Sequence, residues 1–83
     1  MKSIADPRYL EIIASLRAAR EKAGMSQEEL ASRIGKPQSF VSKVEVCERR
    51  LDMIETLVVC EALGITLDLI VPSHLRHLIG KGG

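Results

Sequence analysis

Four polar side chains between residues 38 and 43 have the chemistry to hydrogen-bond the edges of DNA bases. They are Gln38, Ser39, Ser42 and Lys43. An amide can pair with adenine N6 and N7, an ammonium group with guanine O6 and N7, and a hydroxyl with several base edges. On a helix, the four would share one polar arc that contains no carboxylate to repel phosphate. A solvated helix face is the alternative interpretation of the same pattern.

Basic side chains concentrate on and just after this segment, although the formal net charge of the whole chain is only +1. Residues 33–50 hold five basic and two acidic side chains, whereas residues 51–72 hold four acidic side chains and no Lys or Arg. A local excess of cations predicts contacts with DNA phosphates. The candidates beside the polar arc are Arg33, Lys36, Arg49 and Arg50. For Arg33 and Lys36, ordinary surface charge is an equal alternative.

A short helix is expected just before this segment, because its start and end carry strong local signals. Ser26 is a suitable N-cap, and Glu29 three positions later completes the pattern of a capping box. Met25 and Leu30 flank the cap as a hydrophobic staple, which fixes how the chain enters the helix. Gly35 is expected to end the helix.

A second short helix, from about Gln38 to Val46, would present the polar arc. It follows a turn at Lys36-Pro37, and its opposite side carries apolar residues that can anchor it. These residues are Phe40, Val41 and Val44. Two short helices joined by a tight turn with glycine have the shape of a helix-turn-helix. The sequence therefore predicts this motif over residues 26–46.

Two further helices are expected on either side of the motif, and no strand pattern is present. Asp6-Pro7 begins the first, which runs to about Ala23. Its apolar stripe consists of Tyr9, Ile12, Ile13, Leu16, Ala19 and Ala23. Asp52 and Glu55 begin the other, which ends at Gly64. Its expected inner stripe consists of Met53, Thr56, Leu57, Cys60 and Leu63.

The segment after Gly64 predicts one more helix and leaves a sixth open. Thr66 is expected to cap the fifth helix, which Pro72 ends. Its apolar residues are Leu67, Ile70 and Val71. Ser73 offers a cap for a short sixth helix through Ile79. With flexible ends at about residues 1–5 and 80–83, the sequence predicts one all-α domain over residues 1–83.

Several other classes of protein are not supported by the sequence. Cys47 and Cys60 have no zinc spacing and make no disulfide framework, which favours a reduced, cytoplasmic protein. His74 and His77 have no third ligand nearby, so a solvated tail is favoured over a metal site. No apolar run approaches the roughly 18 residues of a membrane span. Without a nucleophile and base set or a phosphate loop, neither an enzyme nor a cofactor is expected.

The stretches LRAAREKAGMSQEELASRIGKPQSFVSKVE and EALGITLDLI carry a family resemblance. Together with ERRLDMIETL between them, they resemble the Xre family of helix-turn-helix regulators, the group of the lambdoid phage repressors and Cro. The resemblance covers roughly Leu16 to Val71, about two thirds of the chain. It implies a five-helix fold like that of the lambda repressor, which binds double-stranded DNA.

The resemblance also implies roles for individual residues. Bases would be read from Gln38, Ser39 and Lys43, with Ser42 between them. Gln27 would hold a phosphate and support Gln38, while Arg49 and Arg50 would lie along the DNA backbone. An internal ion pair between Arg20 and Glu45 would tie the first helix to the third. Relatives usually bind as two-fold dimers on half-sites about one helical turn apart.

Two positions depart from the family pattern. The family usually has glycine where this chain has Cys47, and a left-handed conformation there would cost roughly 1–2 kcal/mol. Either the loop differs or this cost is tolerated. Pro37 replaces the usual Ser or Thr cap, so the reading helix is expected to lack a side-chain N-cap.

The expected function is that of a sequence-specific regulator of transcription. It would act as a repressor, as a homodimer on a palindromic operator. The alternative is an antitoxin-like protein that binds a partner protein and regulates its own operon. Apolar residues late in the chain would either close the core or form the dimer seam. They are Leu69, Leu75, Leu78 and Ile79.

Overall fold

The helices expected from the sequence are present in a computed structural model, which describes residues 6–80. They are α1 (Pro7–Lys22), α2 (Gln27–Arg33), α3 (Gln38–Glu45) and α4 (Met53–Leu63), followed by the 3-10 helices η1 (Leu67–Leu69) and η2 (Ser73–Ile79). No strand occurs between residues 6 and 80. The all-α prediction is confirmed, and the expected fifth and sixth helices take the form of the two 3-10 segments. The expected flexible ends, apart from Gly80, lie outside the described residues.

Local signals set the bounds of the first helix. The Asp6 side chain accepts a hydrogen bond from the backbone N–H of Arg8 at 2.9 Å, and Pro7 follows as the first helical residue. Gly24 has a φ of 71°, the left-handed conformation that ends helices at glycine. Of the predicted stripe, Ile13 and Leu16 are buried. Ala23, at the frayed end of the helix, is exposed instead.

The capping box predicted for α2 is only half formed. The Ser26 hydroxyl accepts from the backbone N–H of Glu29 at 3.0 Å, as expected of an N-cap. The Glu29 carboxylate does not return the bond to Ser26, because it pairs with Arg33 at 2.9 Å one turn later. Met25 and Leu30 are both buried, as a hydrophobic staple requires.

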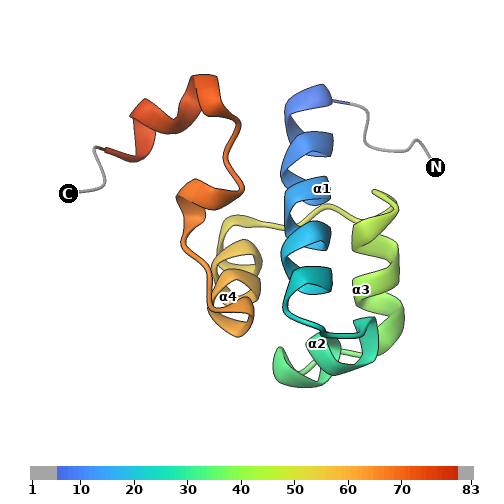
Figure 1. The fold of residues 1–83 in the computed structure, drawn as a ribbon. Coiled ribbons are helices and arrows are strands. Elements are labelled where there is room, and N and C mark those ends of the chain that lie inside the picture. Colours follow the sequence, from blue (N-terminus) through green and yellow to red (C-terminus); the bar gives the residue numbers. More distant parts are fainter. Residues whose placement is uncertain (1–5, 81–83) are drawn as a thin grey trace.

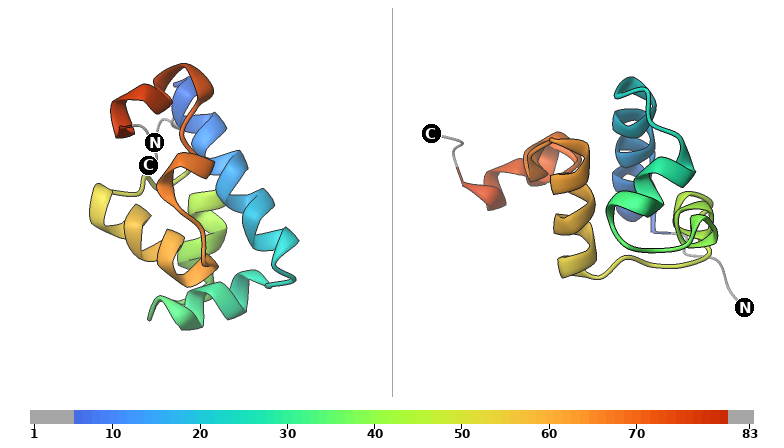
Figure 2. Two further views of the ribbon diagram at one scale, coloured as in Figure 1. Left: turned by 60° about the vertical axis from the view of Figure 1, so that its left-hand side comes forward. Right: turned by 90° about the horizontal axis from the view of Figure 1, so that it is seen from below.

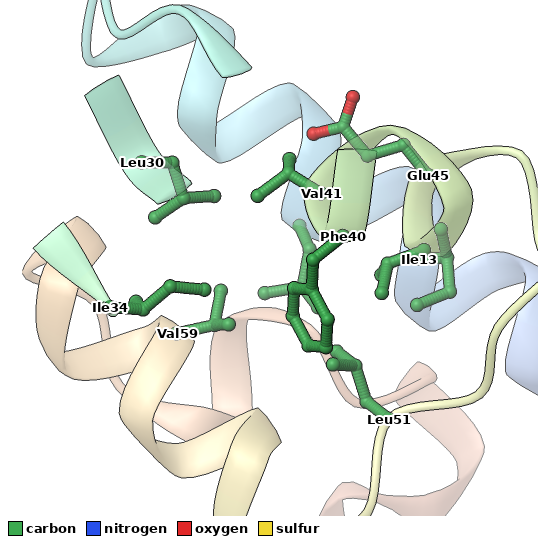
Figure 3. A pocket seen from close by; sticks show the side chains of 10 residues that line it. Ile13, Leu30, Ile34, Phe40, Val41, Glu45, Leu51 and Val59 are labelled. Atoms are coloured by element: carbon green, nitrogen blue, oxygen red, sulfur yellow. The ribbon is translucent and has the colours of Figure 1, made fainter. Parts of the chain in front are cut away.

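Side chains from all four α-helices meet in one core. In Figure 1, α1 stands between α3 and α4, with α2 across their lower ends, and the right-hand view of Figure 2 also shows α1 between α3 and α4. Ile13, Leu30, Val41 and Val59 converge there from different helices (Figure 3). The cavity left among them measures only about 20 Å³, close to the space of a single water. The core therefore fixes the helices against one another and has no room for a ligand.

The inner face of α4 differs from the predicted stripe. Val59, Cys60 and Leu63 are buried, while Met53 and Leu57 are exposed. The helix, MIETLVVCEAL, has apolar residues on every side, so its sequence period does not identify the inner face.

The capping box predicted at the start of α4 is complete. The Asp52 side chain accepts a hydrogen bond from the backbone N–H of Glu55 at 2.7 Å, and the Glu55 side chain accepts one from the backbone N–H of Asp52 at 2.9 Å.

The connection after α4 is fixed by Ile70 and Pro72, the largest fully buried side chains. Thr66 makes no side-chain cap bond to η1, so that part of the prediction is wrong. None of the described residues of η2 is buried. In Figure 1 and in the right-hand view of Figure 2 this segment extends on the side of α4 that is farther from α3.

Candidate nucleic-acid interface

Helix α3 is anchored on one side and exposed on the other. Val41 and Val44 are buried, and Phe40 packs against the core. On the polar side, Gln38, Ser39 and Lys43 are exposed and Ser42 is half-buried. The four residues predicted to contact bases therefore lie on the part of α3 that remains accessible. As expected, Pro37 gives no side-chain cap to the N-terminus of the helix.

The one carboxylate of α3 is turned away from the polar side. Glu45 points away from the apolar side chains of the core (Figure 3) and forms a two-bond ion pair with Arg20 of α1. The distances are 2.6 Å from Nε to Oε2 and 3.0 Å from Nη2 to Oε1. Hydrogen bonding to Glu45 raises the pKa of Arg20 above its usual value. The pair neutralises an acid that would otherwise repel DNA.

Arg20 is held by a third bond as well. Its Nη1 donates to the backbone carbonyl of Met25 at 2.7 Å, and only 8% of the residue is exposed. One guanidinium thus joins α1, the residue before the α2 cap, and α3. Every hydrogen bond here has a charged donor, and such bonds are stronger than neutral ones.

Gln27 extends this pair toward the exposed end of α3. Its Nε2 donates to Glu45 Oε1 at 2.9 Å, and its Oε1 accepts from Gln38 Nε2 at 2.8 Å. An ionised carboxylate only accepts hydrogen bonds, so Gln27 must present its N–H₂ group to Glu45 and its carbonyl to Gln38. Gln38 must then direct its own N–H₂ group toward Gln27. We call this chain of four residues, Arg20, Glu45, Gln27 and Gln38, the polar relay.

The relay leaves a defined set of groups on Gln38. One N–H of Gln38 is used by Gln27, while no described residue bonds its second N–H or its side-chain carbonyl, and the residue is exposed. This donor and acceptor pair matches the N7 and N6 groups of adenine in the major groove. The arrangement fixes the amide before any ligand binds, which lowers the entropic cost of binding.

The loop after α3 ends the helix with a residue in the left-handed conformation. Cys47 has a φ of 62° and is the one non-glycine residue with positive φ among residues 6–80. The N–H of Cys47 bonds the carbonyl of Val44 at 3.0 Å, and that of Glu48 bonds Lys43 at 2.9 Å. This pattern is a Schellman motif, which usually has glycine at the left-handed position. The loop keeps its shape, and the strain of a side chain at Cys47 is tolerated.

The two arginines of the loop have different environments. Arg49 forms a two-bond ion pair with Glu55 of α4, both bonds at 2.9 Å, and its guanidinium lies 4.5 Å from the centre of the Phe40 ring. The Arg49 bonds, with one from the Asp52 N–H, lower the pKa of Glu55 to about 2. Arg50 lies over the Tyr9 ring at 4.9 Å, so cation–π contacts hold both side chains.

The other predicted phosphate contacts surround α2 and the turn. Arg33 pairs with Glu29 on the exposed side of α2, and Lys36 lies 5.4 Å from the Phe40 ring centre. Within the described part of the chain, no carboxylate pairs with Lys36, Lys43 or Arg50. These three cations are therefore the most available for an anionic ligand, whereas Arg33 and Arg49 already have partners.

Two residues that support the interface were not predicted in that role. Tyr9 was expected only as part of an apolar stripe. Its hydroxyl also accepts a hydrogen bond from the backbone N–H of Leu51 at 3.0 Å, and its ring makes the cation–π contact with Arg50. Glu55 was expected only as part of a cap. Its second function, to hold Arg49, has no local sequence signal, because the partner lies across the loop.

The described residues also bear on metal binding, thiol reactivity and membrane crossing. No cluster of three metal-ligating side chains occurs there. Cys60 is buried, as predicted for a core residue, and burial raises the pKa of its thiol. No helix between residues 6 and 80 has the length and apolar character needed to cross a membrane.

Residues 16–70 match a family model described as Helix-turn-helix. Among solved structures, an XRE-family like protein from Pseudomonas syringae pv. tomato str. DC3000 is 41% identical, with a TM-score of 0.74 over 89% of this chain and 88% of that one. No curated protein matches the chain.

Two regulators with lower identity share the same fold. The clp gene regulator ClgR from C. glutamicum is 27% identical, with a TM-score of 0.70 over 81% of this chain and 90% of its own. A hypothetical transcription factor, NHTF from Neisseria, is 26% identical, with a TM-score of 0.71 over 96% of this chain and 98% of its own.

Proposed function

This chain belongs to the Xre-type helix-turn-helix family of DNA-binding transcriptional regulators, and from that premise we propose that it is a sequence-specific repressor acting as a homodimer on a palindromic operator. The family is one of transcription factors and not of enzymes. The observation that carries the proposal is the polar relay, which orients the amide of Gln38 on the exposed end of α3. Binding to chromosomal DNA would place the protein in the cytoplasm.

We assign base reading to the polar side of α3. Gln38 would pair with an adenine through its carbonyl and its second N–H. Lys43, one and a half turns later, would reach a guanine or a neighbouring phosphate. Ser39 and Ser42 would contact base edges between them. The accessible groups of these four residues, with no carboxylate beside them, support this assignment.

Phosphate contacts would surround the reading helix. Gln27 uses one N–H for Glu45, and its second N–H is available to a phosphate. Lys36 and Arg50 would supply charge directly, since neither has a carboxylate partner in the described chain. Arg33 and Arg49 would have to share their guanidinium groups with Glu29 and Glu55. These five residues would set position and affinity and not sequence preference.

A repressor of this kind gains specificity from two-fold symmetry. Two copies related by a two-fold axis would place two α3 helices on two half-sites, which makes the preferred site palindromic. Bound across a promoter, such a dimer would exclude the transcription machinery.

An antitoxin-like role remains a second candidate, because exposed apolar side chains on α4 and η2 would suit a partner protein. Met53, Ile54 and Leu78 are 66%, 68% and 72% exposed.

Selection of bound sequences from random duplex DNA tests the proposal. The expected result is a palindromic motif with an adenine in each half-site, and binding that weakens steeply with salt. A selection that yields no preferred sequence at low salt would contradict it.

A further inference from the structure

The outer side of α4 is apolar and uncovered in the described structure. We define the α4 outer face as Met53, Ile54, Leu57 and Val58, all of which are exposed. At 100° per residue these four lie within an arc of about 140°, opposite the buried residues Val59 and Leu63. Four neighbouring apolar side chains on one helix are typical of an interaction surface and not of random exposure.

One acidic residue completes this face. Glu61 is exposed and falls within the same arc, one turn beyond Leu57. Within the described chain no Lys or Arg pairs with Glu61, although Lys36 of the turn before α3 lies beside Ile54 and Val58. A group that covers the α4 outer face should therefore bring apolar side chains together with one cation.

The η2 segment has that composition, and its residues Arg76 and Ile79 border a hollow that Thr66 and Asp68 also line. Its sequence, SHLRHLI, places Leu75, Leu78 and Ile79 around Arg76. None of its described residues is buried, and Leu78 and Ile79 are both exposed. Within the described chain, its one side-chain hydrogen bond runs from Arg76 Nε to the carbonyl of Val71 at 3.2 Å. In Figure 1 and in the right-hand view of Figure 2 the segment extends away from α4 and α3.

We propose that η2 of each protomer docks on the α4 outer face of a second copy, with Arg76 facing Glu61 of that copy. The inference rests on the homodimer of the proposed function and names its interface. A reciprocal exchange of this kind has two-fold symmetry, in which each contact occurs twice. Ile70 and Pro72 are buried and anchor the connection, while none of the described residues of η2 is buried, so that the segment is accessible to a second copy.

Direct packing of α4 on α4 fits the charges less well. It would bring the Glu61 carboxylates of two copies onto one apolar surface, whereas the other acid of α4, Glu55, is already paired with Arg49. Like charges that face each other across an interface oppose association. The basic η2 segment instead brings a charge opposite to that of Glu61. Docking of η2 would also bury the exposed side chains of Leu78 and Ile79.

Sedimentation equilibrium of the full chain, without DNA, tests this interface by charge exchange. Glu61→Arg and Arg76→Glu should each weaken the dimer by about ten-fold or more, because like charges then face each other. The double variant should restore the dimer. Leu78→Asp should weaken it as well. Glu11→Arg is the matched control, since it makes the same charge change on an exposed position of α1 and should have no effect.

Each alternative gives a different result. If Glu61→Arg strengthens the dimer, α4 packs on α4 instead. If the wild-type protein stays monomeric, the α4 outer face binds a different partner protein. Either outcome, or a double variant that stays as weak as the single ones, overturns the inference. Circular dichroism of every variant shows whether it is still folded. If a charge variant is unfolded, the test of the interface is the effect of Leu78→Asp on the dimer.

The same variants separate this inference from the proposed function. If the charge exchange behaves as expected but no DNA sequence is preferred, the interface stands and the repressor proposal fails. If a palindromic site is selected but the charge exchange has no effect, the repressor proposal stands and this interface is wrong.

Discussion

The amide of Gln38 is hydrogen-bonded to the amide of Gln27, Nε2 to Oε1 at 2.8 Å, across the turn that joins α3 to α2. Gln27 is in turn fixed by Glu45, whose two oxygens are held by Arg20. The orientation of the group proposed to read a base is thus determined by a buried ion pair. Under the proposed function, stability of the fold and specificity for DNA would depend on the same four side chains.

Gln27→Ala should reduce specificity without touching a base. The variant frees Gln38 to rotate, so the preference at one position of each half-site should weaken along with overall affinity. The loss of affinity for the best site should be about 1 kcal/mol, the usual net value of one hydrogen bond. Binding to operator duplexes that differ at that base measures both effects. An unchanged preference would show that Gln38 needs no support from Gln27.

Arg20→Ala should destabilise the fold strongly. It leaves the Glu45 carboxylate, whose side chain is 6% exposed, without its main partner, and breaking a buried pair typically costs about 3–5 kcal/mol. Urea unfolding measures the change. Arg17→Ala is a matched control, because Arg17 is 4.0 Å from the same carboxylate but 55% exposed, and its loss should cost less than about 1 kcal/mol. Equal effects of the two substitutions would contradict the buried role of Arg20.

The Arg49–Glu55 pair predicts a pH dependence of stability. The pKa of Glu55 is about 2 in the folded protein and 4.5 for an ordinary carboxyl group, so the folded state favours the charged form. Its contribution is fully present above pH 4.5 and disappears as the pH falls toward 2.

Urea unfolding of the wild type and of Glu55→Gln over this range tests the prediction. The wild type should be more stable at neutral pH, and the difference should shrink between pH 4.5 and 2. Glu28→Gln, in an exposed residue of α2, gives the baseline for loss of a surface charge. A difference that stays constant down to pH 2 would mean that the pair adds nothing to stability.

Cys47→Gly should stabilise the protein. Cys47 has a φ of 62°, where a side chain costs roughly 1–2 kcal/mol and glycine costs none. Part of that gain is offset by the greater freedom of glycine in the unfolded chain, so a net gain of about 0.5–1 kcal/mol is expected. Cys47→Ala keeps the strain and removes only the thiol. If glycine is no more stable than alanine in thermal unfolding, the left-handed strain at this position is absent.

The sequence predicts the motif well because its signals are local. Ser26 and Gly35 mark the ends of α2 through capping and backbone conformation, and each acts within a few residues. The register of α4 could not be obtained this way, since apolar residues surround the whole helix and only packing selects its inner side. The engagement of Arg49 by Glu55 was missed for a similar reason, because two residues on either side of a loop meet only in the fold.

The central claim is that α3 reads bases through Gln38 while the cations around it supply affinity. The most direct test compares Gln38→Ala and Arg50→Ala on the selected operator and its single-base variants at fixed salt. Gln38→Ala should cost about 1–3 kcal/mol on the operator and remove discrimination at one base position in each half-site. Arg50→Ala should weaken binding to all duplexes alike and reduce the salt dependence by about one phosphate contact per subunit. If the two variants lose affinity in the same way on every duplex, Gln38 does not read a base and the account is wrong.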